Sequence, residues 1–212
     1  MRISKTTVAA LGATALIGST MLAAAPAAQA ADGTTSLATV LKAGQAKFDR
    51  DFSDYDILTK AVEAVLAAKP DSPVKVLADG NSALTAFIPN DKAFMNLASV
   101  LTGKKVTSEP AAFKAVAGLG IPTVESVLEY HVIPGSTILS GDALKANGAR
   151  LQTALPGKKI GVRVDTAKPS ITLVDAATKL HNPKVILSQV DINTGNKQVA
   201  HGIDAVLLPM NP

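Results

Sequence analysis

The sequence predicts an α+β fold, in which helices and strands occupy different parts of the chain. Amphipathic helical patterns dominate from about residue 54 to residue 135, and short runs typical of strands dominate from there to residue 208. The strands do not alternate regularly with helices, which disfavours a doubly wound parallel sheet. No segment is repeated within the 212 residues, so we expect one domain with an additional N-terminal segment.

The composition excludes several classes of protein. Hydrophobic residues make up 47% of the chain and charged residues 18%, which is typical of a folded protein with a core. Aromatic residues make up only 3%, and no cluster of Lys or Arg exceeds two residues, so we expect no nucleic-acid binding. Cysteine is absent, which excludes disulfides, thiol nucleophiles and thiolate-ligated metal sites.

Residues 1–30 have the pattern of a secretory signal peptide of the bacterial type. Arg2 and Lys5 precede an uncharged, Ala-rich run over 8–25, and Ala28-Gln29-Ala30 provides a cleavage site. A membrane anchor is the alternative, because the run is about long enough to span a bilayer, but its weak hydrophobicity favours cleavage. We therefore expect a secreted, extracellular protein with no membrane span after signal removal. The absence of a lipobox cysteine favours release, with non-covalent association with the cell wall as a second option.

The rest of the chain is expected to begin with a flexible leader over 31–47, which is rich in Ala, Thr and Gly, followed by a domain over 48–210. Apolar residues spaced by three and four from Ile57 to Leu66 predict an amphipathic helix, for which Asp54 and Asp56 offer N-cap oxygens. Residues 74–78 are a candidate for a short strand. Residues 84–88 form an apolar run typical of a buried strand.

Three further helices are expected before residue 135. Asn90 can cap the first of them. Pro110 opens the second, and Gly118 closes it. Pro122 opens the third, which is expected to continue until Pro134 ends it.

Beyond residue 135 the chain contains five runs with the composition of strands, separated by Pro and Gly. Asn193-Thr194-Gly195-Asn196 lies between the last two runs and suits a hairpin loop. The five runs are 151–154, 160–164, 171–174, 184–190 and 198–208.

No motif of an enzyme or a nucleotide-binding protein is present in the sequence. The chain has no GxSxG nucleophile elbow, no P-loop, no GxGxxG and no HExxH. The histidines His131, His181 and His201 are too far apart in the sequence to form a metal-binding pair on one helix. Ser140 and Ser188 have no base close by in the sequence, so hydrolysis is the least favoured activity. We expect no catalytic residue, no metal site and no cofactor.

Four aspartates cluster before the first helix of the domain, at Asp49, Asp51, Asp54 and Asp56. A calcium-binding loop would need Gly at its sharp turn and a late Glu, and neither is in place. The sequence therefore favours a role for these aspartates in helix capping and in stabilising the positive end of the helix dipole.

His131 lies on the apolar stripe of the predicted helix that starts at Pro122. A buried imidazole must satisfy both of its ring nitrogens, so we expect His131 to be structural and to fix the helix end to the sheet. Tyr130 falls off this stripe and is expected to be partly exposed. Its apolar body and polar tip suit a contact surface.

Three segments, in order, resemble the motifs of the fasciclin (FAS1) family. Residues 84–94, LTAFIPNDKAF, are similar to the family's first motif, a strand that runs into a helix. Residues 128–135, LEYHVIPG, are similar to the central Tyr-His motif, and residues 198–209, QVAHGIDAVLLP, to the motif of the closing strand. The resemblance covers about residues 50–210.

The resemblance implies the FAS1 fold, a wedge-shaped β-sandwich of short strands with a helical layer. It also implies structural roles for the residues of the two outer motifs. Phe87 and Phe94 are expected to anchor the strand and the helix to one core. The motif residues are Thr85, Phe87, Pro89, Asn90, Phe94, His201, Gly202 and Asp204.

The resemblance further implies a non-catalytic extracellular domain used in adhesion, whose partner is a cell-surface or extracellular-matrix protein or a polysaccharide. In some animal relatives, integrin contact has been assigned to the Tyr-His segment and to an Asp-Ile element, which correspond to Tyr130-His131 and Asp191-Ile192 here. Gln189-Val190 stand where those relatives have an acidic residue and proline. The stretch 102–121 is longer than the usual helical region of the family.

The alternative function is that of a carrier for a small apolar ligand, either a lipid or haem, in a cleft between helices and sheet. Haem would need an axial histidine or methionine. The candidates are His131, His181, His201, Met95 and Met210.

Overall fold

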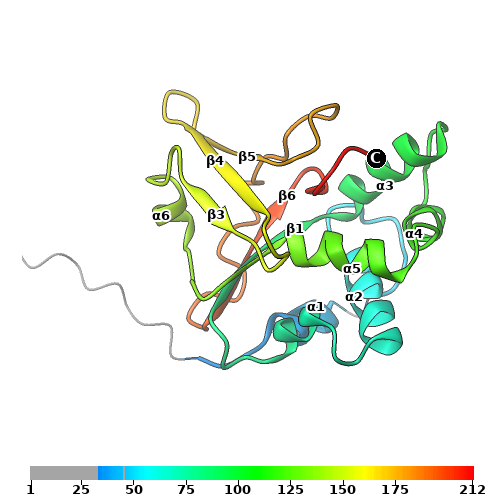
Figure 1. Cartoon of the computed structure of the whole chain (residues 1–212), viewed down its shortest axis with the longest axis horizontal. Helices are drawn as coiled ribbons and strands as arrows, with labels where there is room; N and C mark the ends of the chain where they lie inside the picture. The colour runs from blue at the N-terminus through cyan, green and yellow to red at the C-terminus, as the bar shows by residue number, and fades with distance from the viewer. Residues whose placement is uncertain (1–32, 45) are drawn as a thin grey trace, which may run out of the picture.

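The computed structural model describes residues 33–44 and 46–212, and the predicted signal peptide over 1–30 lies outside this part. Two three-stranded sheets make up the β part of the fold (Figure 1). In the central sheet the middle strand, β1, is antiparallel to β2 and parallel to β6. The second sheet is antiparallel, in the order β3, β4, β5. The strands are β1 (Leu84–Pro89), β2 (Val132–Pro134), β3 (Arg150–Gln152), β4 (Lys159–Asp165), β5 (Ser170–Val174) and β6 (Gln198–Ile203).

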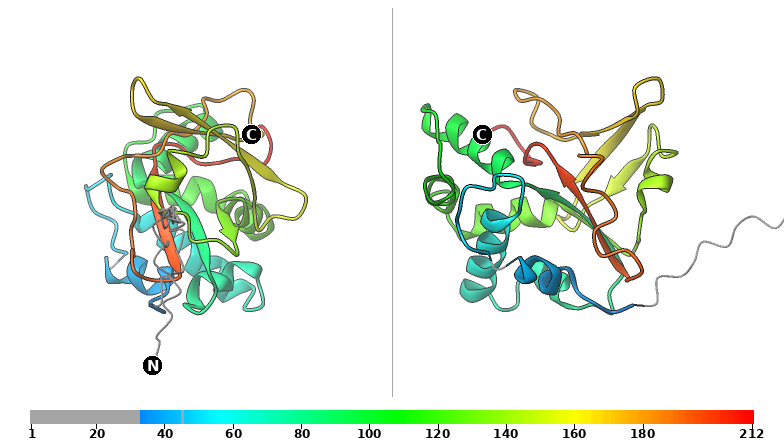
Figure 2. Two further views of the ribbon diagram at one scale, coloured as in Figure 1. Left: turned by 90° about the vertical axis from the view of Figure 1, so that its left-hand side faces the viewer. Right: turned by 180° about the vertical axis from the view of Figure 1, so that it is seen from behind.

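The longer helices gather on one side of the central strands, and the second sheet lies on the other side (Figures 1 and 2). Together these layers confirm the predicted α+β class. The helices are α1 (Leu37–Ala43), α2 (Asp56–Ala68), the 3₁₀ helix η1 (Pro73–Ala78), α3 (Asp91–Thr102), α4 (Glu109–Ala117), α5 (Ile121–Tyr130) and α6 (Ser140–Ala143).

Strand β1 separates two hydrophobic cores, because successive side chains of a strand point to opposite faces. Ala86 and Ile88 belong to the core shared with the helices. Phe87 belongs to the core that contains residues of the second sheet, including Ile160 and Leu173. All six residues of β1 are buried. Burial on both faces explains why this segment is a continuous apolar run in the sequence rather than an alternating one.

The prediction of a flexible leader over 31–47 is wrong for α1. Ser36 caps this helix through its side chain, which accepts a hydrogen bond from the backbone N–H of Thr39. Leu37 is 1% exposed and belongs to the helical core, and its N–H donates to Oε1 of Gln198 at 2.8 Å. Ahead of the helix, Gly33 forms a β-bridge with Asn196. The folded part of the chain therefore begins before residue 48.

Two predicted elements have a different structure. Residues 74–78 form part of η1 rather than a strand, because Pro73 occupies the first turn and the Ser72 hydroxyl accepts from the N–H of Val74. The helix predicted to reach Pro134 ends at Tyr130, and the next residues form β2, which pairs with β1.

The strand runs near the C-terminus are shorter than predicted. Residues 184–190 contain no strand, although Lys184 and Val185 form single bridges with Thr172 and Ile203. Strand β6 stops at Ile203, and the apolar residues that follow it are buried without strand pairing. Apolar composition in this region therefore reflects burial in the core rather than an extended sheet.

Candidate functional site

The Tyr130-His131 pair is buried, contrary to the expected partial exposure of Tyr130. Tyr130 is 0% exposed, and its ring lies in the core that contains residues of the second sheet. Its hydroxyl donates to the carbonyl of Lys159, at the start of β4, at 3.2 Å. Burial raises the pKa of Tyr130 to about 12, so the phenol stays protonated. The pair joins α5 to other parts of the fold, and neither side chain lies on the surface.

Both ring nitrogens of His131 have partners. Nδ1 lies 2.7 Å from the carbonyl oxygen of Val127, and Nε2 accepts a hydrogen bond from the N–H of Leu207 at 3.0 Å. Because Nε2 accepts, the proton of the neutral ring is on Nδ1, which donates to Val127. Burial lowers the pKa of His131 to about 4. The ring ties the end of α5 to the segment after β6, which agrees with the structural role expected from the sequence.

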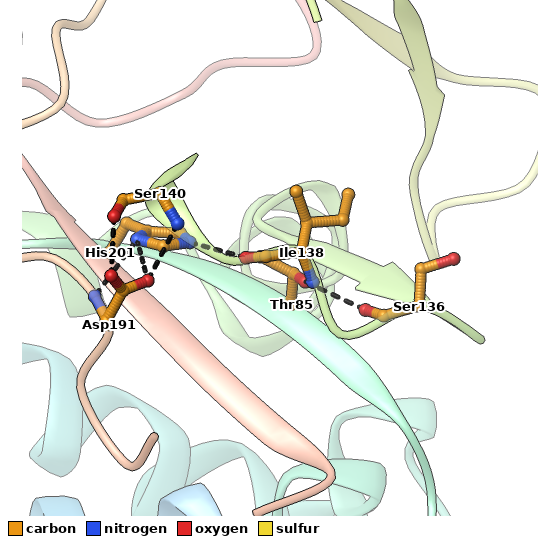
Figure 3. A network of polar contacts seen from close by, with 6 residues as sticks. All are labelled: Thr85, Ser136, Ile138, Ser140, Asp191 and His201. Atoms are coloured by element: carbon orange, nitrogen blue, oxygen red, sulfur yellow. Dashed lines mark hydrogen bonds and ion pairs between the residues drawn. The ribbon is translucent and has the colours of Figure 1, made fainter. Parts of the chain in front are cut away.

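His201, Asp191 and Ser140 form a second polar network (Figure 3). His201, on β6, is 2% exposed and its Nε2 donates to the carbonyl of Ile138 at 2.8 Å. Its Nδ1 accepts from the N–H of Asp191 at 3.2 Å. The Asp191 carboxylate accepts from Ser140, through the N–H at 2.8 Å and the hydroxyl at 2.5 Å. Burial lowers the pKa of His201, which stays neutral in this tautomer.

This network contains Ser, His and Asp but not in the order of a catalytic triad. In a triad the histidine lies between the other two groups and accepts the proton of the serine hydroxyl. Here the aspartate lies between them, the Ser140 hydroxyl donates to Asp191, and the His201 proton is held by a carbonyl. Asp191 has a left-handed backbone with φ of 55°, which its contacts with Ser140 and His201 stabilise. The network holds the start of α6 against the loop that precedes β6.

Thr85 and Asn90 have the local roles expected of the first motif. The Thr85 hydroxyl donates to the carbonyl of Ser136 and accepts from the N–H of Ile138, both at 2.8 Å (Figure 3). Asn90 caps α3, because its side-chain oxygen accepts from the N–H of Ala93 at 3.0 Å. Thr85 therefore fixes the chain that leads to α6.

The expectation that Phe87 and Phe94 share one core is wrong. Phe94 lies in the helical core, while Phe87 faces the other core and its ring is 6.0 Å from that of His201. Pro89, between them, is the last residue of β1 and is itself buried. The first motif thus connects the two cores rather than filling one of them.

Gly202 and Asp204 organise the end of the closing strand. A Cβ at Gly202 would lie 2.6 Å from the Tyr55 hydroxyl and 2.7 Å from Oε1 of Gln189, closer than real side chains approach. Only glycine fits there without a shift of these side chains. Asp204 accepts from the N–H of Lys184 at 2.7 Å.

The acidic residues before α2 do not cap that helix as expected. The first N–H groups of α2 are satisfied by Asp91, whose two carboxylate oxygens accept from Ile57 at 2.9 Å and from Asp56 at 3.2 Å. Tyr55 stands at the N-cap and makes no side-chain hydrogen bond there. The sequence could not show this, because the capping carboxylate comes from α3, more than thirty residues later.

An apolar groove of about 420 Å³ lies between α3, α4, α5 and the C-terminal segment. Leu97 and Leu101 of α3, Val116 of α4 and Val127 of α5 contribute to its lining, and Met210 contributes from the C-terminus. None of the three histidines lines it. The other candidates for a haem ligand are placed elsewhere. Both ring nitrogens of His131 and of His201 form hydrogen bonds within the protein. His181 is exposed, and Met95 is buried in the core. Met210, which is 67% exposed, is the one haem-ligand candidate at the groove.

Comparison with known proteins gives a family for this fold. The model of the fasciclin domain matches residues 56–209. A solved FAS1 domain pair from the insect cell adhesion molecule fasciclin I superposes with a TM-score of 0.54 at 18% identity, covering 82% of this chain and 51% of that one. This chain therefore spans about half the length of the solved chain. A search of curated proteins found no significant match.

The architecture agrees with the FAS1 fold predicted from the three motifs. Within the described residues no single helix is long and apolar enough to cross a membrane, and α4 and α5 reach that length only together, across a bend of 106°. The match of the family model to most of the chain, supported by the fold, is decisive. The chain belongs to the fasciclin domain family.

Proposed function

We propose that the protein is a secreted, non-catalytic interaction module that binds a cell-surface or extracellular-matrix protein or polysaccharide. The observation that carries this proposal is the fasciclin match over residues 56–209. Fasciclin domains occur in extracellular or cell-surface proteins, and the solved neighbour comes from a cell adhesion molecule. The predicted signal peptide over 1–30 supports export, and association with the cell wall would place the module next to such partners.

The contact surface is proposed to lie around Asp191-Ile192 and α6 rather than at Tyr130-His131. Asp191 and Ile192 are half-buried, and Ser140 joins Asp191 to the start of α6. Three exposed apolar side chains are close to these elements in the sequence: Leu139 (38% exposed) and Leu144 (39%) flank α6, and Leu187 (46%) lies four residues before Asp191. Exposed apolar residues next to a rigid polar network suit binding to another molecule. Tyr130 lies beneath this region, because its ring belongs to the same core as Ala143 of α6 and Val190.

The test is saturable binding of labelled protein to intact cells and to cell-wall material from its own source. Leu139→Ser combined with Leu144→Ser should weaken binding at least tenfold. Val100→Ser is the matched control, because Val100 is a 50% exposed apolar residue on α3 outside the proposed surface. If wild-type protein binds no such material, the module function is refuted. If both variants bind as wild type does, the assignment of the surface is wrong.

The apolar groove favours a second candidate function, carriage of a small lipid. Its volume of about 420 Å³ is in the range of ligand sites, and its lining is almost entirely apolar. A lipid fits this lining better than haem, because Met210 is the only potential axial ligand in it.

Native mass spectrometry of the protein from its source tests the carrier function, followed by titration with a fluorescent fatty acid. A retained mass that disappears on denaturation is expected for a carrier. Leu101→Gln, in the groove lining, should reduce fatty-acid binding, while Val100→Gln, at the neighbouring position outside the lining, should not. A bare mass together with no fatty-acid binding would exclude this function and leave the interaction module unaffected.

A further inference from the structure

Three carboxylates from separate parts of the chain converge beside the N-terminal ends of three helices. Asp54 precedes α2, Asp91 is the first residue of α3, and Glu109 is the first residue of α4. One carboxylate oxygen of each lies within 4.8 Å of the others. Asp91 and Glu109 are both 0% exposed, and Asp54 is half-buried. This acidic site, defined by Asp54, Asp91 and Glu109, is not used by either proposed function.

Two oxygens of the acidic site are buried and have no hydrogen-bond donor. They are Oδ1 of Asp54 and Oε1 of Glu109, and no other buried side-chain nitrogen or oxygen in the described residues lacks a partner. Three of the other oxygens have backbone donors: Oε2 of Glu109 accepts from the N–H of Asp49 at 2.7 Å, and both oxygens of Asp91 accept from the first residues of α2. A buried carboxylate oxygen without a donor is costly. A proton shared with Asp91 relieves Asp54 at this site, whereas Oε1 of the fully buried Glu109 has no such partner and is free to bind a cation.

The acidic site also has no counter-charge among the described side chains. None of its carboxylates lies within 4.0 Å of a Lys, Arg or His nitrogen of that part of the chain. The charge of Lys60 acts on the neighbouring Asp56, but Lys60 is paired with Glu63 at 3.6 Å. Buried carboxylates are normally neutralised by a paired cation, by a metal ion or by protons.

We propose that Asp54, Asp91 and Glu109 bind a calcium ion. The available ligands are all oxygens, which select hard cations such as Ca²⁺ and Mg²⁺. Magnesium usually keeps several waters and is held by one or two carboxylates, whereas calcium accepts a larger set of protein oxygens in a less regular geometry, so three converging carboxylates suit calcium better. Asp49 and Asp56 lie at the edge of the site, within 4.8 Å of an oxygen of Asp54, and can complete the coordination directly or through water.

Calcium in this position would connect the turn before α2 to the starts of α3 and α4. The four aspartates clustered in the sequence include neither Asp91 nor Glu109, because these two ligands come from the next two helices. The dissociation constant expected for calcium bound to an extracellular module is about 10⁻⁴–10⁻³ M.

The direct test is calorimetric titration of CaCl₂ into the full protein after removal of metals with EDTA and dialysis. We expect one calcium ion to bind per chain and to raise the melting temperature. The affinity for Mg²⁺ should be at least tenfold lower than that for Ca²⁺. Glu109→Gln and Asp54→Asn keep the side-chain shape and should weaken calcium binding at least 100-fold. Asp51→Asn is the matched control, because Asp51 is exposed, lies in the same acidic segment and is outside the site.

Emission from Tb³⁺ bound in place of calcium tests the site in the wild-type protein, so the result does not depend on whether those variants fold. Tyr55 adjoins Asp54 and Asp56 in the sequence and should sensitise the emission of Tb³⁺ bound in place of calcium. Calcium should displace this emission, and Tyr55→Phe should abolish it while leaving the calorimetric affinity within threefold.

Three results would overturn the proposal. The first is no heat of binding and no sensitised emission up to 10 mM Ca²⁺. The second is an equal loss of affinity in Asp51→Asn and Glu109→Gln, which would indicate diffuse attraction to surface charge. The third is a Glu109→Gln variant that melts higher than wild type in EDTA and in calcium alike, which would show that protons neutralise the site.

Discussion

Lowering the pH should weaken the fold through His131. The unfolded chain binds a proton at this histidine below about pH 6.5, whereas the folded protein does so only near pH 4, because the ring is buried. Between these values the unfolded state holds more protons, so the free energy of unfolding falls as the pH falls. Protonation would also place a proton on Nε2, which now accepts from the N–H of Leu207.

The size of this effect follows from the two pKa values. A histidine shifted from 6.5 to about 4 lowers the free energy of unfolding by about 2 kcal/mol between pH 7 and pH 5, and by about 3 kcal/mol in total at lower pH. His201, whose pKa is also lowered, acts in the same direction, so the wild-type loss is larger than that of His131 alone.

Urea denaturation of wild type and of His131→Gln at pH 7 and pH 5 isolates the contribution of His131. The variant will be less stable at pH 7, because Leu207 loses its acceptor, but its further loss on going to pH 5 should be smaller than that of wild type by about 2 kcal/mol. His181→Gln, at an exposed position, should keep the wild-type difference. An equal loss in wild type and His131→Gln would refute this account of His131.

Three more substitutions test the contacts that hold the fold together. Thr85→Val removes the hydroxyl that accepts from Ile138 and should lower the free energy of unfolding by about 1–3 kcal/mol in urea, while Thr85→Ser should recover most of it. Gly202→Ala should destabilise by about 1–3 kcal/mol because its Cβ has no space, whereas Gly141→Ala, where no atom lies within 4 Å, should melt close to wild type. Gln198→Leu removes the acceptor for the first turn of α1, so hydrogen exchange in α1 should accelerate at least tenfold while exchange in β4 stays unchanged. Equal exchange in α1 of wild type and Gln198→Leu would show that packing of α1 alone protects it.

The sequence was informative where the determinants of structure are local. The continuous apolar run and the following Asn90 predicted β1 and the start of α3 correctly, because strand burial and helix capping depend on neighbouring residues. Helix α1 was missed, because it has only seven residues and owes its position to a glutamine of β6.

The parts of the candidate sites that could not be predicted depend on distant segments. Partial exposure of Tyr130 is predicted because the residue falls off the apolar stripe of the predicted helix, but α5 ends at Tyr130 and its ring lies in the core that contains residues of the second sheet. Glu109 reaches the acidic site only in the folded chain. It accepts a hydrogen bond from the N–H of Asp49, which lies 60 positions earlier in the sequence. Periodicity and spacing report neither kind of contact.

The parallel pairing of β1 with β6 has a consequence for how the chain folds. These strands are separated by more than a hundred residues in the sequence. Closing so long a loop costs about 4 kcal/mol of chain entropy, which slows folding because the contacts that repay it form late. A nascent chain on the ribosome cannot complete its central sheet until residue 203 has been made. The central sheet therefore forms only after residues 84–203 have been synthesised, and until then β1 lacks its parallel partner.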